Sequence, residues 1–133
     1  MLEKIKTEDK LIAIIIRADY RKDGIEFFTP DDFSQQLAYM NRPAGYTIAP
    51  HVHNLEPREV YFTQEVLLIR KGKVKVDFYT QERKYLESKV LSTGDVILLA
   101  GGGHGFTMLE PTEMIEIKQG PYLGEHDKTK FDP

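Results

Sequence analysis

The chain has 133 residues, of which 41% are hydrophobic and 29% charged, and its formal net charge at pH 7 is −3. This composition is typical of one folded domain with a single hydrophobic core. The small negative charge offers no basic face, so we expect neither a nucleic-acid partner nor a membrane partner. The absence of cysteine excludes disulfides and restricts any metal site to nitrogen and oxygen ligands.

The beginning of the chain does not resemble a targeting segment. The first ten residues, MLEKIKTEDK, are mostly charged and polar, unlike a secretory leader. The longest aliphatic run, Leu11–Ile16, is far too short to cross a bilayer. We therefore expect a cytoplasmic protein.

Short strands separated by turn residues make up most of the chain, at the spacing of an all-β sandwich or barrel. Leu11–Ile16 is apolar on both faces, which predicts either burial on both faces or pairing across a dimer interface. The expected strands are Leu11–Arg17, Ile25–Thr29, Tyr46–His53, Val60–Arg70, Lys73–Thr80, Tyr85–Leu91, Asp95–Leu99, Gly105–Leu109 and Glu113–Gln119.

One short N-terminal helix is expected over residues 29–43, TPDDFSQQLAYMNRP. Thr29 can cap this helix, and Pro30 suits its first position. Phe33, Leu37 and Met40 would share one helical face, as the apolar residues of a packed helix do.

Two of the four histidines stand two apart on an expected strand. Because side chains at i and i+2 lie on the same side of a strand, His51 and His53 point together. Two imidazoles that converge in this way can form half of a metal site. The alternative is a pair of solvated or hydrogen-bonded histidines without a ligand.

The residues around this histidine pair resemble the first motif of the cupin family. That motif runs glycine, five residues, H-x-H, a short gap, glutamate, six residues and glycine. The matching residues are Gly45, His51, His53, Glu65 and Gly72.

A second stretch, STGDVILLAGGGHGF, resembles the second cupin motif, which opens with a glycine and an aspartate and ends in a histidine. Here these residues are Gly94, Asp95 and His104. The resemblance covers residues 45–119. It implies a double-stranded β-helix, the jelly-roll or cupin barrel, formed by residues 45–119. Residues 1–44 would pack on this barrel, and residues 120–133 would form a C-terminal tail.

The chain departs from the family pattern in both motifs. Eleven residues separate His53 from Glu65, a longer gap than the family usually has. Glu59 is closer to the usual gap and is a rival for the carboxylate ligand, whereas the spacing from Glu65 to its following glycine fits. In the second motif, Ala100 and Met108 stand where a proline and an asparagine are usual.

The resemblance implies a set of ligands for one divalent transition metal. Three neutral histidines and a carboxylate suit Fe, Mn, Zn, Ni or Co, and the ligands alone do not choose among them. They leave one or two coordination positions open, which a catalytic metal needs. The implied ligands are His51, His53, Glu65 and His104.

Side-chain alternation along the expected strands predicts which residues line a ligand pocket beside the metal. Gln119 would reach inward from the last strand, past Ile115 and Ile117, and Tyr61 is the candidate catalytic group for proton transfer. The alternative is that these residues are barrel core with satisfied polar tips. The predicted pocket residues are Thr47, Ala49, Tyr61, Thr63, Phe106, Met108 and Gln119.

Three functions follow from the resemblance. Similarity to small stand-alone cupins of bacterial sugar and surface-polysaccharide metabolism implies a metal-dependent isomerase or epimerase with a small-molecule ligand, such as a sugar or nucleotide-sugar. A second reading is an Fe(II) dioxygenase with the same ligands. A third is a non-catalytic binding module, because no acid–base pair stands out. The family also implies a homodimer, with the N-terminal strands and the C-terminal tail as candidate interface.

Overall fold

The computed structural model describes residues 1–133, and nearly all of their regular structure is β-strand. One 3-10 turn, η1 (Gly124–Asp127), lies near the C-terminus. No helix is long and apolar enough to span a membrane. The all-β class is therefore confirmed. The strands are β1 (Leu2–Thr7), β2 (Lys10–Ile16), β3 (Gly24–Phe27), β4 (Ala38–Asn41), β5 (Glu65–Lys71), β6 (Lys73–Tyr79), β7 (Tyr85–Ser92), β8 (Val96–Leu99), β9 (Gly103–Met108) and β10 (Glu113–Lys118).

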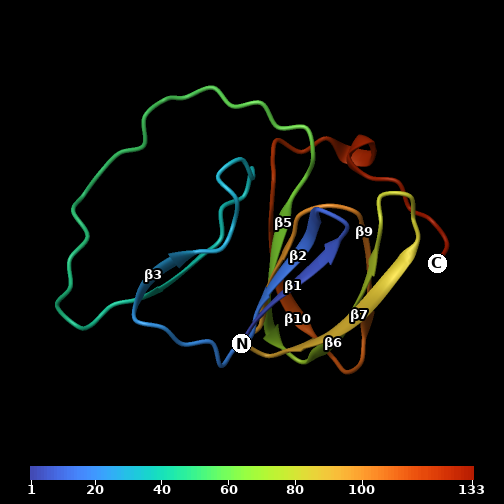
Figure 1. The fold of residues 1–133 in the computed structure, drawn as a ribbon, viewed down its shortest axis with the longest axis horizontal. Coiled ribbons are helices and arrows are strands. Elements are labelled where there is room, and N and C mark those ends of the chain that lie inside the picture. Colours follow the sequence, from blue (N-terminus) through green and yellow to red (C-terminus); the bar gives the residue numbers. More distant parts are fainter.

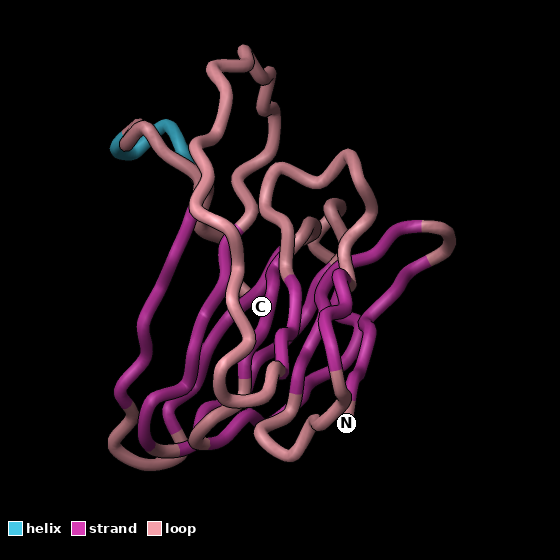
Figure 2. Tube along the Cα trace, turned by 90° about the vertical axis from the view of Figure 1, so that its left-hand side faces the viewer, coloured by secondary structure: helices cyan, strands magenta, loops and turns pink.

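Two antiparallel sheets form the body of the molecule, which we call the sandwich (Figures 1 and 2). One sheet has the order β1-β2-β8-β5-β10, and the other has the order β7-β6-β9. Neither sheet closes on itself. Apolar side chains from both sheets pack together between them, because alternate residues of each strand face the partner sheet. This inner core contains Ile5, Ile12, Ala13, Ile15, Leu67, Ile69, Val74, Val76, Phe78, Leu91, Ile97 and Leu99.

The second strand is buried on both of its faces within one chain. Ala13 and Ile15 belong to the inner core, whereas Ile14 and Ile16 pack on the outer face of the five-stranded sheet with Phe28. Strands β1 and β8 pair with its two edges. Of the two alternatives for the apolar run, burial on both faces is the one observed.

The helix expected over residues 29–43 does not form, and that prediction was wrong. Strand β4 occupies the end of this stretch and pairs with β3 in a separate two-stranded hairpin. The residues between the two strands form a wide loop. Figure 1 shows the hairpin beside the sandwich.

Side-chain hydrogen bonds explain why the loop replaces the helix. Gln36 Nε2 donates to the carbonyl oxygens of Pro30 and Phe33, each at 2.9 Å, so its amide satisfies backbone groups that a helix would pair. The backbone N–H of Leu37 donates to Thr29 Oγ1 at 3.2 Å. Phe33 and Leu37 pack on the outer cluster of the five-stranded sheet. The apolar spacing that predicted a helical face thus serves to dock a loop.

Residues 42–64, which we call the arm, contain no strand, and the strand expected at Tyr46–His53 is absent. The strand expected from Val60 begins only at Glu65. Figure 1 shows the arm leaving the outer end of the hairpin and returning to β5 by a wide path away from the sandwich. A strand needs a neighbour to take up its backbone hydrogen bonds, and the arm has none.

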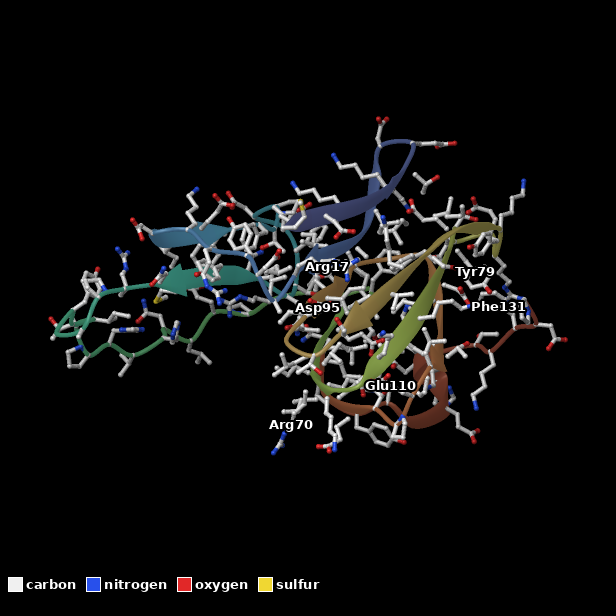
Figure 3. All side chains as sticks on the ribbon, turned by 90° about the horizontal axis from the view of Figure 1, so that it is seen from below. Arg17, Arg70, Tyr79, Asp95, Glu110 and Phe131 are labelled. Carbon is white, nitrogen blue, oxygen red and sulfur yellow. The ribbon has the colours of Figure 1, made fainter.

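A buried carboxylate ties the segment after β2 to the turn between β7 and β8. Asp95 is 3% exposed, and its carboxylate accepts hydrogen bonds from the backbone N–H groups of Ala18 and Ser92, both at 2.8 Å. Arg17 Nη1 donates to the same carboxylate at 3.0 Å (Figure 3). The aspartate of the second motif is therefore a structural residue here.

The C-terminal tail lies on its own chain. Phe131 packs edge-on against Tyr79 of β6, with ring centroids 5.1 Å apart (Figure 3). The guanidinium of Arg83 lies 5.6 Å from the centre of the same ring. The tail thus covers one end of the three-stranded sheet.

Candidate metal-binding site

The two sheets bring one predicted carboxylate and one predicted histidine together. Glu65 begins β5 in one sheet, and His104 lies on β9 in the other. Glu65 Oε1 and His104 Nε2 are 2.8 Å apart, and both side chains are largely sheltered from solvent. Leu67 and Ile69 follow Glu65 on the same face of β5 and enter the inner core, which anchors the strand behind the carboxylate.

Phe106 and Met108 share the face of His104 on β9, as the alternation predicted. His104 stands opposite Phe78 of β6, and Phe106 stands opposite Val76. Phe106 packs against the inner core, and its ring centroid is 5.5 Å from that of His104. Met108 ends the row and is exposed.

The charge on Glu65 is strongly stabilised. The hydrogen bond from His104 is the main cause that lowers the pKa of Glu65 to about 2, and burial opposes this shift. A hydrogen bond shared with Glu116 and the positive charge of Lys118 lower the pKa further. Glu65 is thus ionised throughout the neutral range, the state in which a carboxylate binds a metal.

Glu116 is a neighbour of this pair that the sequence reasoning missed. Its hydrogen bond with Glu65, its partial burial and the negative charge of Glu65 raise the pKa of Glu116. In the ladder between β5 and β10, Glu116 stands opposite Leu67 and Lys118 stands opposite Glu65. Residues that stand opposite one another share a face, so Glu116 and Lys118 point inward.

The pairing of β10 with β5 also shows that the prediction of which β10 residues point inward was wrong. Ile117 stands opposite Val66, which packs in the outer cluster, so Ile115 and Ile117 face outward. Gln119 follows them and accepts a hydrogen bond from Gln35 Nε2 at 3.4 Å, in the loop that covers the outer face. The alternation in EMIEIK alone left open which of its two faces is buried.

The other two predicted ligands lie on the arm. The rings of His51 and His53 are nearly perpendicular, with centroids 5.3 Å apart, and both are exposed. His51 Nδ1 is 2.9 Å from the carbonyl oxygen of Ala49, and Thr47 is exposed nearby. The four predicted ligands therefore form two separate pairs. No group of three or more His, Asp or Glu residues lies close enough to hold a metal ion within this single chain.

The remaining candidates also lie on the arm. The Tyr61 hydroxyl donates to Glu59 at 2.7 Å, and this hydrogen bond is the main cause that raises the pKa of Tyr61. Both side chains are exposed. Thr63 donates instead to Asp127 in η1. Glu65, rather than Glu59, is the carboxylate that meets a histidine.

A buried glutamine, also missed by the sequence reasoning, holds the end of the arm at the sandwich. Gln64 Oε1 accepts hydrogen bonds from the backbone N–H of Gln35 at 3.1 Å and from Ser34 at 3.3 Å. Its amide nitrogen donates to the carbonyl oxygen of Ala100 at 3.5 Å. Gln64 thereby fixes the start of β5 and the position of Glu65.

One surface hollow, of about 420 Å³, lies over β1 and the loop that follows β3. It includes neither Glu65 nor His104, and charged side chains make up half of its lining. The lining residues are Lys4, Lys6, Glu8, Asp9, Leu11, Phe28, Thr29 and Pro30.

Comparison of the chain with family models, with curated proteins and with solved structures finds no match. The cupin resemblance therefore rests on the residues of the two motifs. Of these residues, Glu65 of the first motif and His104 of the second lie in contact.

Proposed function

We propose that the chain is a single-domain cupin that binds one divalent transition metal. In this proposal, its β-sandwich is a jelly-roll barrel. The observation that carries this proposal is the 2.8 Å separation of Glu65 Oε1 and His104 Nε2. One residue comes from the first cupin-like motif and the other from the second. They come from different sheets and meet in a partly sheltered position.

The donor set fits such a metal. Imidazole nitrogens and an ionised carboxylate suit Fe, Mn, Zn, Ni or Co. The low pKa of Glu65 keeps its carboxylate available as a ligand. His51 and His53 would complete the set once the arm approaches the sandwich.

The substrate we propose is a small polar metabolite such as a sugar or nucleotide-sugar, and the reaction is of the isomerase or epimerase type. This part of the proposal rests on the cupin resemblance. A bound metal would act as a Lewis acid toward a carbonyl or a diol. Among the residues of the chain, Glu65 and His104 would hold the metal, and Phe106 would shield the histidine from water.

Elemental analysis of the untagged protein tests metal binding. We expect about one equivalent of metal per chain, and a fall of about tenfold or more in Glu65→Ala and in His104→Ala, because each loses a ligand. His126→Ala is the matched control, since His126 is exposed in η1 and lies outside the pair. Circular dichroism checks that each variant folds. Unchanged metal content in both ligand variants would contradict the proposal.

The identity of the metal then selects the assay. Manganese, zinc, nickel or cobalt would lead to isomerase assays on nucleotide-sugars monitored by NMR. Iron would lead to an oxygen-uptake assay, which tests the dioxygenase alternative. If no metal binds even after reconstitution, a non-catalytic binding module would replace the enzyme reading.

A further inference from the structure

The C-terminal tail, residues 120–133, crosses the end of the sandwich at which the candidate site lies. Glu65 is the first residue of β5 and His104 is the second residue of β9, so both side chains stand where their strands begin. Figure 1 shows the tail leaving β10 at this end and passing over it toward β6 and β7. The tail therefore runs from one sheet to the other across the end that contains Glu65 and His104.

The first anchor of the tail lies on the five-stranded sheet. Asp127 in η1 accepts a hydrogen bond from the hydroxyl of Thr63, two residues before Glu65. The other oxygen of the Asp127 carboxylate lies 4.0 Å from Lys118 Nζ. Lys118 stands opposite Glu65 in the ladder between β10 and β5. Asp127 is thus held beside the strand end that carries the candidate carboxylate.

The second anchor lies on the three-stranded sheet. The ring of Phe131 packs on Tyr79, and a Cβ placed at Gly103 would lie 3.0 Å from an atom of the same ring. Tyr79 stands opposite Gly103, which directly precedes His104 in β9. The ring therefore fits against a strand backbone that carries no side chain at this position, next to the candidate histidine.

The segment between the anchors is long enough to bridge the two sheets. An extended chain spans about 3.3–3.6 Å per residue, so the four residues from Asp127 to Phe131 reach roughly 13–14 Å, whereas packed sheets lie about 10 Å apart. Lys128 lies in this segment. The hydrogen bond with Glu65 is the main cause that raises the pKa of Glu116, and the positive charges of Lys118 and Lys128 oppose this rise. Lys128 is therefore close to the carboxylates at this end.

Side chains alone hold the tail in this position. No backbone group of residues 120–133 pairs with a backbone group of the sandwich. Apart from Gly124, Asp127 and Phe131, every residue of the tail is exposed, so the two anchors are its only partly buried side chains. A segment with few buried contacts and no backbone pairing opens at a lower free-energy cost than the strands beneath it.

We propose that the tail is a strap that closes and opens the end of the sandwich over the Glu65–His104 pair. In the closed state Asp127 and Phe131 anchor the strap on the two sheets, and it limits access to His104. In the open state Phe131 leaves the sheet, and the pair becomes accessible to water, to a metal ion and to a small polar ligand. Control of metal and ligand entry rests on the proposed function, whereas the closure itself rests on the two anchors.

The reactivity of His104 toward diethyl pyrocarbonate tests the closure without any metal. Peptide mass spectrometry gives the rate of modification at each histidine of the EDTA-treated protein, and His53, exposed on the arm, is the internal reference. Phe131→Ala should raise the rate at His104 about fivefold or more, because it removes a ring whose partial burial favours the closed state by about that factor. Tyr122→Ala is the matched control and should leave the rate unchanged, since Tyr122 is the other aromatic residue of the tail and is 86% exposed.

A reversible cross-link tests the other anchor. Because the chain has no cysteine, Thr63→Cys and Asp127→Cys in one chain place a single pair of thiols where these two side chains now touch. Oxidation with diamide should hold the strap closed and lower the rate at His104 severalfold, because the disulfide removes open conformations. Reduction with dithiothreitol should restore the rate, so the same protein serves as its own control.

Either measurement can overturn the proposal. Circular dichroism checks that each variant folds. An unchanged rate at His104 in folded Phe131→Ala, or in the cysteine variant after oxidation, would show that the tail does not close this end of the sandwich. If Phe131→Ala does not fold, the cysteine variant alone decides.

The rate of metal release separates the strap from the proposed function. If the wild type binds metal, Phe131→Ala should lose it to EDTA about fivefold faster than the wild type or Tyr122→Ala, for the same reason. A protein that binds no metal but shows the expected changes at His104 would contradict the metal site and leave the strap in place. A protein that binds metal but shows no change at His104 would leave the metal site in place and overturn the strap.

Discussion

The sandwich and the arm contain similar kinds of residue but have opposite environments. Leu67 on β5 is 4% exposed, whereas Leu55 on the arm is 100% exposed. Val76 is buried in the inner core, whereas Val52, which lies between the two histidines of the arm, is 85% exposed. Alternation of apolar and polar residues thus produces a strand only where a neighbouring strand takes up its backbone groups and a facing layer covers its apolar side.

The same contrast divides the candidate metal site. Glu65 and His104 are positioned by strands whose other residues enter the core, and they meet at 2.8 Å. His51 and His53 lie where nothing from the sandwich restrains them. The two pairs therefore differ in how far the rest of the chain restrains them.

The largest expected loss of stability comes from the buried carboxylate of the sandwich. Asp95→Ala should lower the free energy of unfolding by about 3–5 kcal/mol, because it leaves the backbone N–H groups of Ala18 and Ser92 without an acceptor and removes one of the two carboxylates that bind Arg17. Urea unfolding followed by circular dichroism measures this. Asp19→Ala is the control, since Asp19 pairs with the N-terminal amine at the surface, where water screens the pair, and the expected loss is much smaller. Equal losses in the two variants would contradict a structural role for Asp95.

Alanine substitutions of one leucine in the sandwich and one in the arm compare how much each region contributes to stability. Leu67→Ala removes buried methyl groups and should cost about 2–5 kcal/mol of unfolding free energy. Leu55→Ala should change it by less than about 0.5 kcal/mol in dilute protein, because Leu55 is exposed. Both values come from urea unfolding at one low protein concentration. If the loss in Leu55→Ala grows with protein concentration, that residue lies in a contact between copies.

Two glycines with similar backbones make a finer comparison. Gly72 has φ +102° and Gly45 has φ +86°, a region that side chains disfavour. A Cβ at Gly72 would lie 2.3 Å from the carbonyl oxygen of Pro111, whereas nothing lies within 4 Å of one at Gly45. We expect Gly72→Ala to cost about 1–3 kcal/mol and Gly45→Ala clearly less, by thermal unfolding. The reverse order would contradict the close approach to Pro111 as the source of the cost at Gly72.

The smallest expected effect is a pH dependence of the folding stability that arises from Glu3 on β1. The hydrogen bond from Arg17 is the main cause that lowers the pKa of Glu3 below its ordinary value of 4.5. Because the folded-state pKa is the lower one, the pair stabilises the fold above pH 4.5, and this contribution disappears as the pH falls through the folded-state pKa. Glu3→Gln should lose up to about 1 kcal/mol at pH 7 and little at pH 3.

Unfolding curves for the wild type and Glu3→Gln at pH 3 and pH 7 give the comparison. A difference that stays the same at both pH values would rule out the charge of Glu3 as its source. Glu8→Gln is the control, because Glu8 makes no ion pair and is exposed in the turn after β1.

The positions of most strands in the sandwich could be predicted from the sequence, because the alternation of apolar and polar residues and the flanking turn residues indicate the same boundaries. The alternation of Val74, Val76 and Phe78 with charged residues placed β6 within one residue, and the glycine at position 72 marked the turn before it. Strand β1 was missed, because LEKIKT shows only a weak apolar alternation. It forms because its backbone pairs along β2.

The amino-acid sequence by itself determined the all-β class, most strands of the sandwich and the residue types of the candidate site, since these depend on local alternation, turn residues and ligand chemistry. Tertiary structure alone decided that residues 29–43 form a loop and a strand, that Glu116 faces Glu65, and that the two histidines of the arm lie apart from His104. The physical reason is that each of these outcomes depends on which distant strand supplies hydrogen-bond partners and cover. The spacing of apolar residues within one segment does not indicate which distant strand will pair with that segment or cover it.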